Sequence, residues 1–279
     1  GISGMGVNVP DILLAPGSQP IVTTKQVFRF SPAAAYKVND ALTLGASLNI
    51  VNQSLAMSMP VPNPASPPPT IQVNLPQNQQ FGFGATLGAT YKINPNLQAG
   101  FTWVTKTDVS DMEYNTDKGL VSFDMDMPAS VAFGLAFRPM PGLLVEADIK
   151  RIFFNDVMDR IDVTKPATLV MPNPLAFGWD DQTVFSIGVK KDMGPMSISV
   201  GYNYGESPIG PEDVNMNLGS TAIVEHHLSF GLTRKFSDKV SGSFAYTHAF
   251  ENDLTSSVAP YNTIEISQNQ YNFNIAYQF

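Results

Sequence analysis

His227 and Ser229 are the one pair of side chains whose types and spacing could make a nucleophile and its base. They stand two residues apart in an alternating segment, so both would face the same side of a strand. A serine nucleophile also needs a group that orients the histidine. The sequence places no asparagine or acid obviously for that role, and we therefore expect no enzymatic activity.

The histidines and cysteines predict no metal site. His226 and His227 are adjacent, and neighbouring residues of a strand point to opposite faces. The sequence contains no cysteine, which excludes disulfides and thiolate ligands. We expect neither a metal nor another cofactor.

Charged side chains on one side of alternating segments could bind an anionic group. Glu146, Asp148 and Lys150 follow one another on one side of residues 143–154. The side that carries the small residues also holds Arg29, Lys37, Lys106 and Arg138. Two interpretations are open. Opposite charges pair in a solvated network, or Arg29 or Lys150 binds a substrate carboxylate, because a buried anion needs a cationic partner.

Two long connecting segments, 58–77 and 109–127, predict exposed apolar side chains. In or beside them lie Met57, Met59, Val61, Ile71, Val73, Leu75, Met112, Leu120, Met125 and Met127. Methionine packs flexibly around varied apolar ligands. These residues are therefore candidates for substrate binding, and the alternative is that the loops pack on themselves.

Composition limits the class of protein. Charged residues make up 14% of the 279 residues, against about 25% in typical soluble domains. No run approaches the roughly 18 apolar residues that a membrane helix needs. The net charge of −8 argues against a nucleic-acid partner. Low charge without a helical span is typical of membrane β-barrels, and a soluble sandwich is the alternative.

Strict alternation of apolar with small or polar residues predicts strands. It is clearest at the end of the chain, where Tyr271, Phe273, Ile275, Tyr277 and Phe279 share one side. The alternating segments are 26–37, 41–52, 79–92, 97–107, 129–138, 143–154, 182–190, 196–204, 222–236, 240–250 and 271–279, with the shorter segment 3–9 as a twelfth. We expect the last strand to pair with the first and close a barrel.

Short and long connections alternate along the chain. Tight turns rich in Pro, Gly, Asn and Asp separate long segments at 10–25, 58–77, 109–127, 155–180, 206–221 and 252–265. Bacterial outer-membrane barrels combine short periplasmic turns with long extracellular loops. The sequence thus predicts an all-β fold, a single outer-membrane domain over residues 1–279 that forms a transmembrane antiparallel up-and-down β-barrel.

Aromatic residues on the apolar side are predicted to form two levels. Near the turns lie Tyr36, Tyr91, Phe137, Phe236, Tyr277 and Phe279, and near the long loops lie Trp103, Phe153, Tyr204, Phe250 and Tyr271. Such rings favour the membrane–water boundary. Acidic residues at and within 109–127 (Asp108, Asp111, Glu113, Asp117, Asp124 and Asp126) are either solvated or bridge through cations to lipopolysaccharide.

Several hairpins resemble those of the FadL/TodX-type outer-membrane transporters. These are TTKQVFRFSPAAAYKVNDALTLGASLNIV at 23–51, MPASVAFGLAFRPMPGLLVEADIKRIFF at 127–154 and WDDQTVFSIGVKKD at 179–192. The terminal Tyr-x-Phe of Tyr277 and Phe279 also fits. The likeness extends over essentially the whole chain.

The resemblance implies a 14-stranded barrel, plugged by an N-terminal hatch, for passive uptake of long-chain fatty acids or other hydrophobic molecules. The ligand would be captured between the two outer loops, enter the barrel and leave sideways into the membrane. By this resemblance, we expect residues 1–279 to match strands three to fourteen, without the hatch and the first two strands. Tyr277 and Phe279 would be the signal for the barrel-assembly machinery. The alternative function is a structural or partner-binding barrel within a surface assembly.

Overall fold

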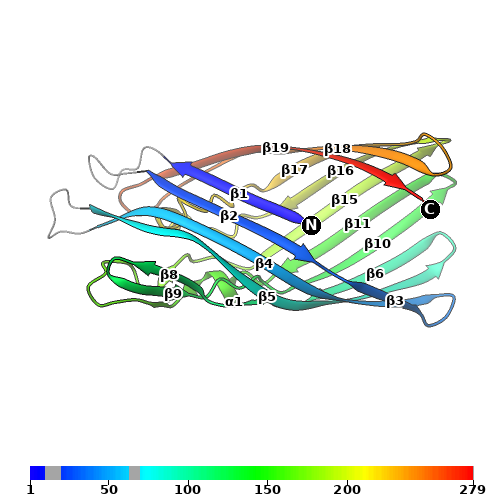
Figure 1. Cartoon of the computed structure of the whole chain (residues 1–279). Helices are drawn as coiled ribbons and strands as arrows, with labels where there is room; N and C mark the ends of the chain where they lie inside the picture. The colour runs from blue at the N-terminus through cyan, green and yellow to red at the C-terminus, as the bar shows by residue number, and fades with distance from the viewer. Residues whose placement is uncertain (10–19, 63–69, 279) are drawn as a thin grey trace.

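The computed structural model describes residues 1–9, 20–62 and 70–278 and is built almost entirely of antiparallel strands. One sheet of 14 strands curls around a hollow interior (Figure 1). Its main path has twelve strands, in agreement with the eleven longer predicted strands and the shorter one at 3–9. They are β1 (Ile2–Val9), β2 (Ile21–Phe30), β4 (Leu42–Pro62), β5 (Thr70–Asn94), β6 (Leu97–Val104), β10 (Ser130–Met140), β11 (Leu143–Ile152), β15 (Gln182–Met193), β16 (Met196–Gly205), β17 (His226–Lys235), β18 (Val240–Thr255) and β19 (Thr263–Tyr277).

Two short strands complete this sheet. β3 (Ala33–Lys37) pairs with β4, and β7 (Asp108–Val109) pairs with β5. The single strand expected at 26–37 is divided between β2 and β3, which pair with β4 in one continuous register. Pro32 lies at the break, where it has no N–H to donate to a ladder.

The two faces of the sheet differ as the alternation predicts. The outer face carries large exposed apolar side chains such as Phe133, Phe185 and Phe273. These aromatics also occupy the middle of the strands, between the two expected levels. On the inner face, Gly134 is paired with Gly100 on one side and with Asp148 on the other. Small inward residues leave the interior of the barrel open.

Two of the expected loops are largely strand. β4 and β5 pair out to Pro62 and Thr70, and β18 and β19 pair out to Thr255 and Thr263. The predicted loops at 58–77 and 252–265 were therefore too long. Alternation continues through Leu55, Met57 and Met59, and a bulge after Leu55 lets the ladder extend past Pro76.

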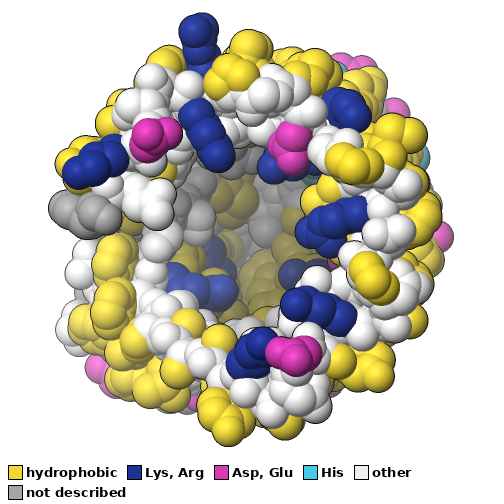
Figure 2. Space-filling model, turned by 90° about the vertical axis from the view of Figure 1, so that its right-hand side faces the viewer, with side chains coloured by type: hydrophobic (Ala, Val, Ile, Leu, Met, Phe, Trp, Pro, Cys, Tyr) yellow, Lys and Arg dark blue, Asp and Glu magenta, His cyan; other side chains and the backbone are white. Residues whose placement is uncertain are grey.

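Inside the long-hairpin end, the remaining connections pack on one another. They contain β8 (Met112–Thr116), β9 (Gly119–Phe123), α1 (Asn155–Met158), β12 (Arg160–Ile161), β13 (Val163–Thr164), β14 (Leu175–Ala176) and the 3-10 turn Val214–Met216. Residues 105–129, 153–181 and 206–225 form with the ends of β4, β5 and β19 the principal buried apolar cluster, which we call the loop-end core. The opposite end carries the short turns and is open (Figure 2).

The edges of the sheet are β1 and β19. Among the described residues β1 pairs only with β2 and β19 only with β18, so the expected ladder between the first and last strands is not observed. Phe279 lies outside the described residues. No helix in the described part of the chain is long and apolar enough to cross a membrane.

Candidate functional site

A cavity of about 370 Å³ opens on the inner face, where the barrel meets the loop-end core. Its walls come from β1, β15, β16, β17, β19 and the two loops at 153–181 and 206–225. The apolar lining is Met5, Val7, Phe154, Trp179, Val184, Pro208, Ala222, Val224 and Ile266. The polar lining is Gln182, Asn203, Thr221, Glu225, His227 and Gln268. A concave, mostly apolar site with a few polar groups is the usual form of a small-molecule site.

Phe154 and Trp179 form the aromatic wall of the cavity. Their ring centroids are 5.0 Å apart at an interplanar angle of 71°, the edge-to-face arrangement that aromatic pairs prefer. Trp179 is buried and donates its indole N–H to the side-chain oxygen of Asn217 at 2.7 Å. Asn217 in turn donates to the carbonyl oxygen of Phe177 at 2.7 Å. The wall is therefore held rigid from behind by the next loop.

Gly205 sets the width of the cavity on the strand side. A Cβ at this position would lie 2.9 Å from the Cγ2 of Val184 and 3.4 Å from the side-chain nitrogen of Gln182. Val184 and Gly205 are register partners on β15 and β16. The absence of a side chain at Gly205 therefore keeps this part of the wall hollow.

Several polar groups of the lining already form hydrogen bonds within the protein. Gln182 donates to the carbonyl oxygen of Glu206 at 2.7 Å, and Asn203 donates to Ser186 at 2.8 Å. One carboxylate oxygen of Glu225 accepts from the backbone N–H of Ser207 at 3.0 Å. The buried Nδ1 of His227 has no hydrogen-bond partner among the described residues. His227 therefore has unused hydrogen-bonding capacity at the cavity.

The predicted capture residues come together, but not as an exposed groove. Met57 pairs with Leu75, Met59 with Val73, and Val61 with Ile71 across the β4–β5 hairpin. Val73, Leu75, Met112 and Met125 are buried in the loop-end core, whereas Met57, Met59 and Met127 are partly buried against it. The side chains of Val61 and Ile71 lie outside the described part. Leu120 is exposed.

The expectation of exposed apolar loops was therefore wrong for these buried residues. The hairpin β8–β9 folds back onto the β4–β5 hairpin, where the hydroxyl of Tyr114 donates to the carbonyl oxygen of Leu55 at 3.1 Å. Gln53 donates to the carbonyl oxygen of Met125 at 2.8 Å. Burial of both apolar faces follows from this contact, because each hairpin alone would leave one face exposed to water.

The inward charges pair only in part: Lys106 forms ion pairs with Asp108 and Asp126, and Lys37 forms one with Asp40. Glu146, Asp148 and Lys150 have no ion-pair partner within the described ranges. Arg29 contacts the sulfur of Met127 at 3.8 Å. Lys150 is the register partner of Val184, so it faces the lumen beside the cavity without lining it. Arg29 and Lys150 therefore remain available for an anionic group.

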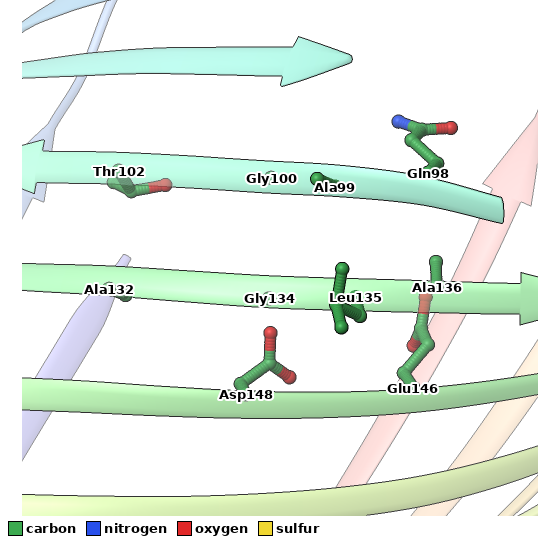
Figure 3. A pocket seen from close by; sticks show the side chains of 10 residues that line it. All are labelled: Gln98, Ala99, Gly100, Thr102, Ala132, Gly134, Leu135, Ala136, Glu146 and Asp148. Atoms are coloured by element: carbon green, nitrogen blue, oxygen red, sulfur yellow. The ribbon is translucent and has the colours of Figure 1, made fainter. Parts of the chain in front are cut away.

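A second, shallower hollow of about 200 Å³ lies on the inner wall of β6, β10 and β11 (Figure 3). Glu146 and Asp148 project into it from β11. The carboxylate of Asp148 lies directly over Gly134, in the space that a Cβ would fill. The hollow is acidic and has few apolar side chains, so it is a poorer site for a hydrophobic ligand than the larger cavity.

The His-x-Ser pair does not form a catalytic arrangement. His227 and Ser229 both face inward, as the alternation predicted, but Ser229 shares a hydrogen bond with Thr247 at 2.9 Å. His226 points outward, where its Nδ1 lies 2.6 Å from the hydroxyl of Tyr202. Within the described residues no group of three or more potential ligands could hold a metal ion.

The acidic residues of 105–127 are only partly solvated. Asp126 is buried, forms an ion pair with Lys106 and accepts the backbone N–H of Val109 at 2.7 Å. Lys106 also pairs with the exposed Asp108 at 2.8 Å. Partial burial, followed by the hydrogen bond with Asp126, raises the pKa of Asp124 to about 6. This cluster ties the loop to the end of β6.

Sequence reasoning missed the cavity, although it quoted some of its residues. Trp179 is part of the WDD stretch that carries the family resemblance, and His227 was a candidate only for a catalytic base or a metal ligand. Nothing in the spacing of Phe154, Gly205 and Glu225 along the sequence marks them as residues of a binding site. The signal that could have drawn attention was Trp179 itself, since it is one of only two tryptophans and lies in a predicted loop.

An antiparallel sheet with an apolar outer face and a hollow inner face defines a transmembrane β-barrel of the bacterial outer membrane. A family model described as "Outer membrane protein transport protein (OMPP1/FadL/TodX)" matches residues 14–278. The chain belongs to this family, as the resemblance predicted. The family is one of transport proteins and not of enzymes.

Solved structures agree on the fold. The toluene transporter TbuX of Ralstonia pickettii is 19% identical, with a TM-score of 0.75 over 99% of this chain and 76% of that one. The toluene transporter TodX of Pseudomonas putida is 21% identical, with a TM-score of 0.71 over 99% and 76%. A FadL homologue of Pseudomonas aeruginosa is 14% identical, with a TM-score of 0.70 over 98% and 72%. No curated protein matches the sequence.

Proposed function

We propose that this protein admits small, uncharged hydrophobic molecules, monocyclic aromatic compounds in particular, by passive diffusion through the barrel. The observation that carries the proposal is the lining of the cavity. Its walls are apolar and aromatic, it contains Glu225, and no lysine or arginine is among its described lining residues. A carboxylate ligand would meet a like charge there without a cationic partner.

The structural relatives support this choice of ligand class. TbuX and TodX are described as toluene transporters, and CymD, which shares the fold at 20% identity, is described as a monoaromatic hydrocarbon channel. Long-chain fatty acids are the alternative within the same family. They would require a cation such as Lys150 or Arg29 at some point of the path.

Binding in detergent tests the proposal directly. Trp103→Phe leaves Trp179 as the only tryptophan of this sequence, so its fluorescence reports on the cavity wall. We expect toluene to change that fluorescence saturably and oleate to do so weakly or not at all. Trp179→Phe, which keeps Trp103 on the outer face, is the matched control. Tighter binding of oleate than of toluene, lost in Lys150→Gln, would assign the protein to fatty acids instead.

Capture at the loop end is a further part of the proposal. Met57 and Met59 are partly buried at the border of the loop-end core, and their flexible side chains could separate from it around an apolar ligand. The buried Met112, Val73 and Met125 would then form the deeper wall, with Val61 and Ile71 nearer the tip. We expect Met59→Asp to slow toluene uptake into whole cells without changing binding to the cavity.

We also propose that residues 1–279 act as one barrel domain with the long hairpins outside the cell and the short turns in the periplasm. Because the sequence has no cysteine, a single introduced cysteine is the only thiol of this sequence that a maleimide can label. A membrane-impermeant maleimide should label Lys118→Cys on intact cells and leave Asp238→Cys unlabelled until the outer membrane is permeabilised. The reverse pattern would invert the orientation.

Two partner proposals concern assembly and lipid. Tyr277 and Phe279 would be recognised by the barrel-assembly machinery, so Phe279→Ser should reduce the heat-modifiable, folded form in the membrane.

The exposed acids of 105–127 would approach lipopolysaccharide through bridging cations. Chelation with EDTA should then release lipopolysaccharide from wild type more readily than from a variant with Asp111→Asn and Asp117→Asn.

A further inference from the structure

The turn end of the barrel carries a ring of cations. Each of the five strands that run into a short turn has one inward-facing lysine or arginine within its last four residues. They are Lys37 on β3, Lys92 on β5, Arg138 on β10, Lys190 on β15 and Lys235 on β17. The first four residues of the strands that leave these turns, β4, β6, β11, β16 and β18, contain none.

The register of the sheet turns these five side chains toward the lumen. Lys37 is opposite Thr43, and Lys92 is opposite Gln98. Lys190 is opposite Ser199, and Lys235 is opposite Ser241. Arg138 follows the outward Phe137 and donates its backbone N–H to Asn96. Directly opposite residues share a face, and the polar partners mark that face as the inner one.

Figure 2 shows lysine and arginine side chains in dark blue around the mouth at the turn end, with the hollow interior behind them. All five residues are exposed. Two of them have acidic partners, Lys37 with Asp40 at 2.6 Å and Lys190 with Asp192 at 3.3 Å. Lys92, Arg138 and Lys235 have no ion-pair partner among the described residues. The five cations of the ring therefore outnumber their two acidic partners.

We propose that this ring is a binding site for small multivalent anions at the turn-end mouth of the lumen. Rings of lysine and arginine are the usual device by which a pore attracts anions, and a concave wall of one sign concentrates the field. The ligand class is a soluble molecule with several phosphate, sulfonate or carboxylate groups. Glu146 and Asp148 lie farther along the lumen on β11 and limit how deeply such an anion can enter.

The inward direction distinguishes a soluble anion from a lipid headgroup. Headgroups would approach the outer side of the wall, where different cations lie. Lys191 is opposite Leu143 and Ile198 on the outer face. Arg234 also points outward, and its guanidinium carbon is 5.8 Å from the ring centroid of Phe236. Together with Lys239 in the last turn, these residues provide a control set of equal charge.

The test uses 8-hydroxypyrene-1,3,6-trisulfonate and measures its fluorescence anisotropy with the purified, detergent-solubilised full-length protein. We expect saturable binding that weakens as salt is raised. The variant Lys92→Gln, Arg138→Gln and Lys235→Gln should bind at least tenfold more weakly. The variant Lys191→Gln, Arg234→Gln and Lys239→Gln should bind as wild type does.

The neutral triple variant could fail to bind because it does not fold. A second variant therefore keeps the charges and changes the side chains: Lys92→Arg, Arg138→Lys and Lys235→Arg. It should retain binding if charge is what the anion requires. Absence of binding to wild type, or an equal loss in the inward and outward triple variants, would overturn the proposal. Displacement of the dye by phosphatidylglycerol added to the neutral detergent would assign the ring to lipid and likewise overturn it.

Discussion

Trp179 donates its indole N–H to Asn217 at 2.7 Å, and both side chains are buried. The bond joins the loop at 153–181, which carries the aromatic wall of the cavity, to the loop at 206–225, which carries Glu225. Asn217 also donates to the carbonyl oxygens of Phe177 and Asp213. A single polar side chain therefore fixes both sides of the candidate site.

Asn217→Ala should loosen the cavity wall. It leaves the buried indole N–H of Trp179 without an acceptor, at a cost of roughly 1–3 kcal/mol. We expect faster hydrogen exchange in residues 175–181 and weaker toluene binding, with the barrel strands unchanged. Asn115→Ala, on the exposed side of β8, is the control and should alter neither. Unchanged exchange at 175–181 would show that packing of Trp179 alone holds the wall.

Gly205→Leu should fill the cavity from the strand side. A Cβ there already lies 2.9 Å from Val184, so a larger side chain must occupy the hollow or push Val184 aside. We expect toluene affinity to fall about tenfold, or about 1.4 kcal/mol, when measured by fluorescence titration. Gly201→Leu also faces inward on β16 but does not line the cavity, so it should retain affinity. Equal losses in both variants would argue against the assigned site.

Gly82→Ala should weaken the attachment of the inner loop to the barrel. A Cβ at Gly82 would lie 2.8 Å from the carbonyl oxygen of Asp108, where β7 pairs with β5, and the backbone can yield little. We expect a loss of about 1–3 kcal/mol in urea unfolding of the detergent-solubilised protein. At Gly88 the nearest atom is 3.6 Å away. Gly88→Ala should therefore be tolerated, and an equal loss would refute the role of Gly82.

Asp124 should make the stability of the inner loop depend on pH. Its pKa is raised from 3.8 to about 6, so the folded loop holds the proton more tightly than the unfolded chain. The contribution of Asp124 to stability is therefore fully present below about pH 4, decreases as the pH rises toward 6 and is lost above that. The charged groups that face Asp124 are Asp126 and Lys106.

Asp124→Asn should abolish this decline and stabilise the loop at pH 7, as measured by limited proteolysis of residues 105–127 between pH 4 and 7.5. Asp111→Asn, at an exposed position of the same loop, is the control and should leave the decline intact. A wild-type loop that resists proteolysis equally well across this range would contradict the prediction.

The local sequence was sufficient for the strands and their faces. Alternation of Tyr271, Phe273 and Ile275 with Asn272 and Asn274 predicts β19 and its orientation, because side chains of a strand point to alternate sides. The same rule turned His227 and Ser229 inward. Short turns and long connections then indicated the barrel and its two unlike ends.

The cation ring was decided by the tertiary structure, although alternation along each strand determines the face of each of its side chains. Lys37, Lys92, Arg138, Lys190 and Lys235 are scattered over about two hundred positions. Each is an ordinary charge near a turn. Only the curled sheet brings the five turns to one mouth and makes them neighbours.

The loop-end core and the cavity were decided by the tertiary structure alone. Met112 and Met125 are residues of the kind expected in an exposed capture groove. They are buried instead, because their loop contacts β4 and β5. One such contact joins Gln53 to Met125, 72 residues further along the chain. The wall of the cavity likewise depends on Trp179 meeting Asn217, 38 residues along the chain. Alternation is a property of neighbouring residues, whereas the packing of loops depends on which distant segments the curled sheet brings together.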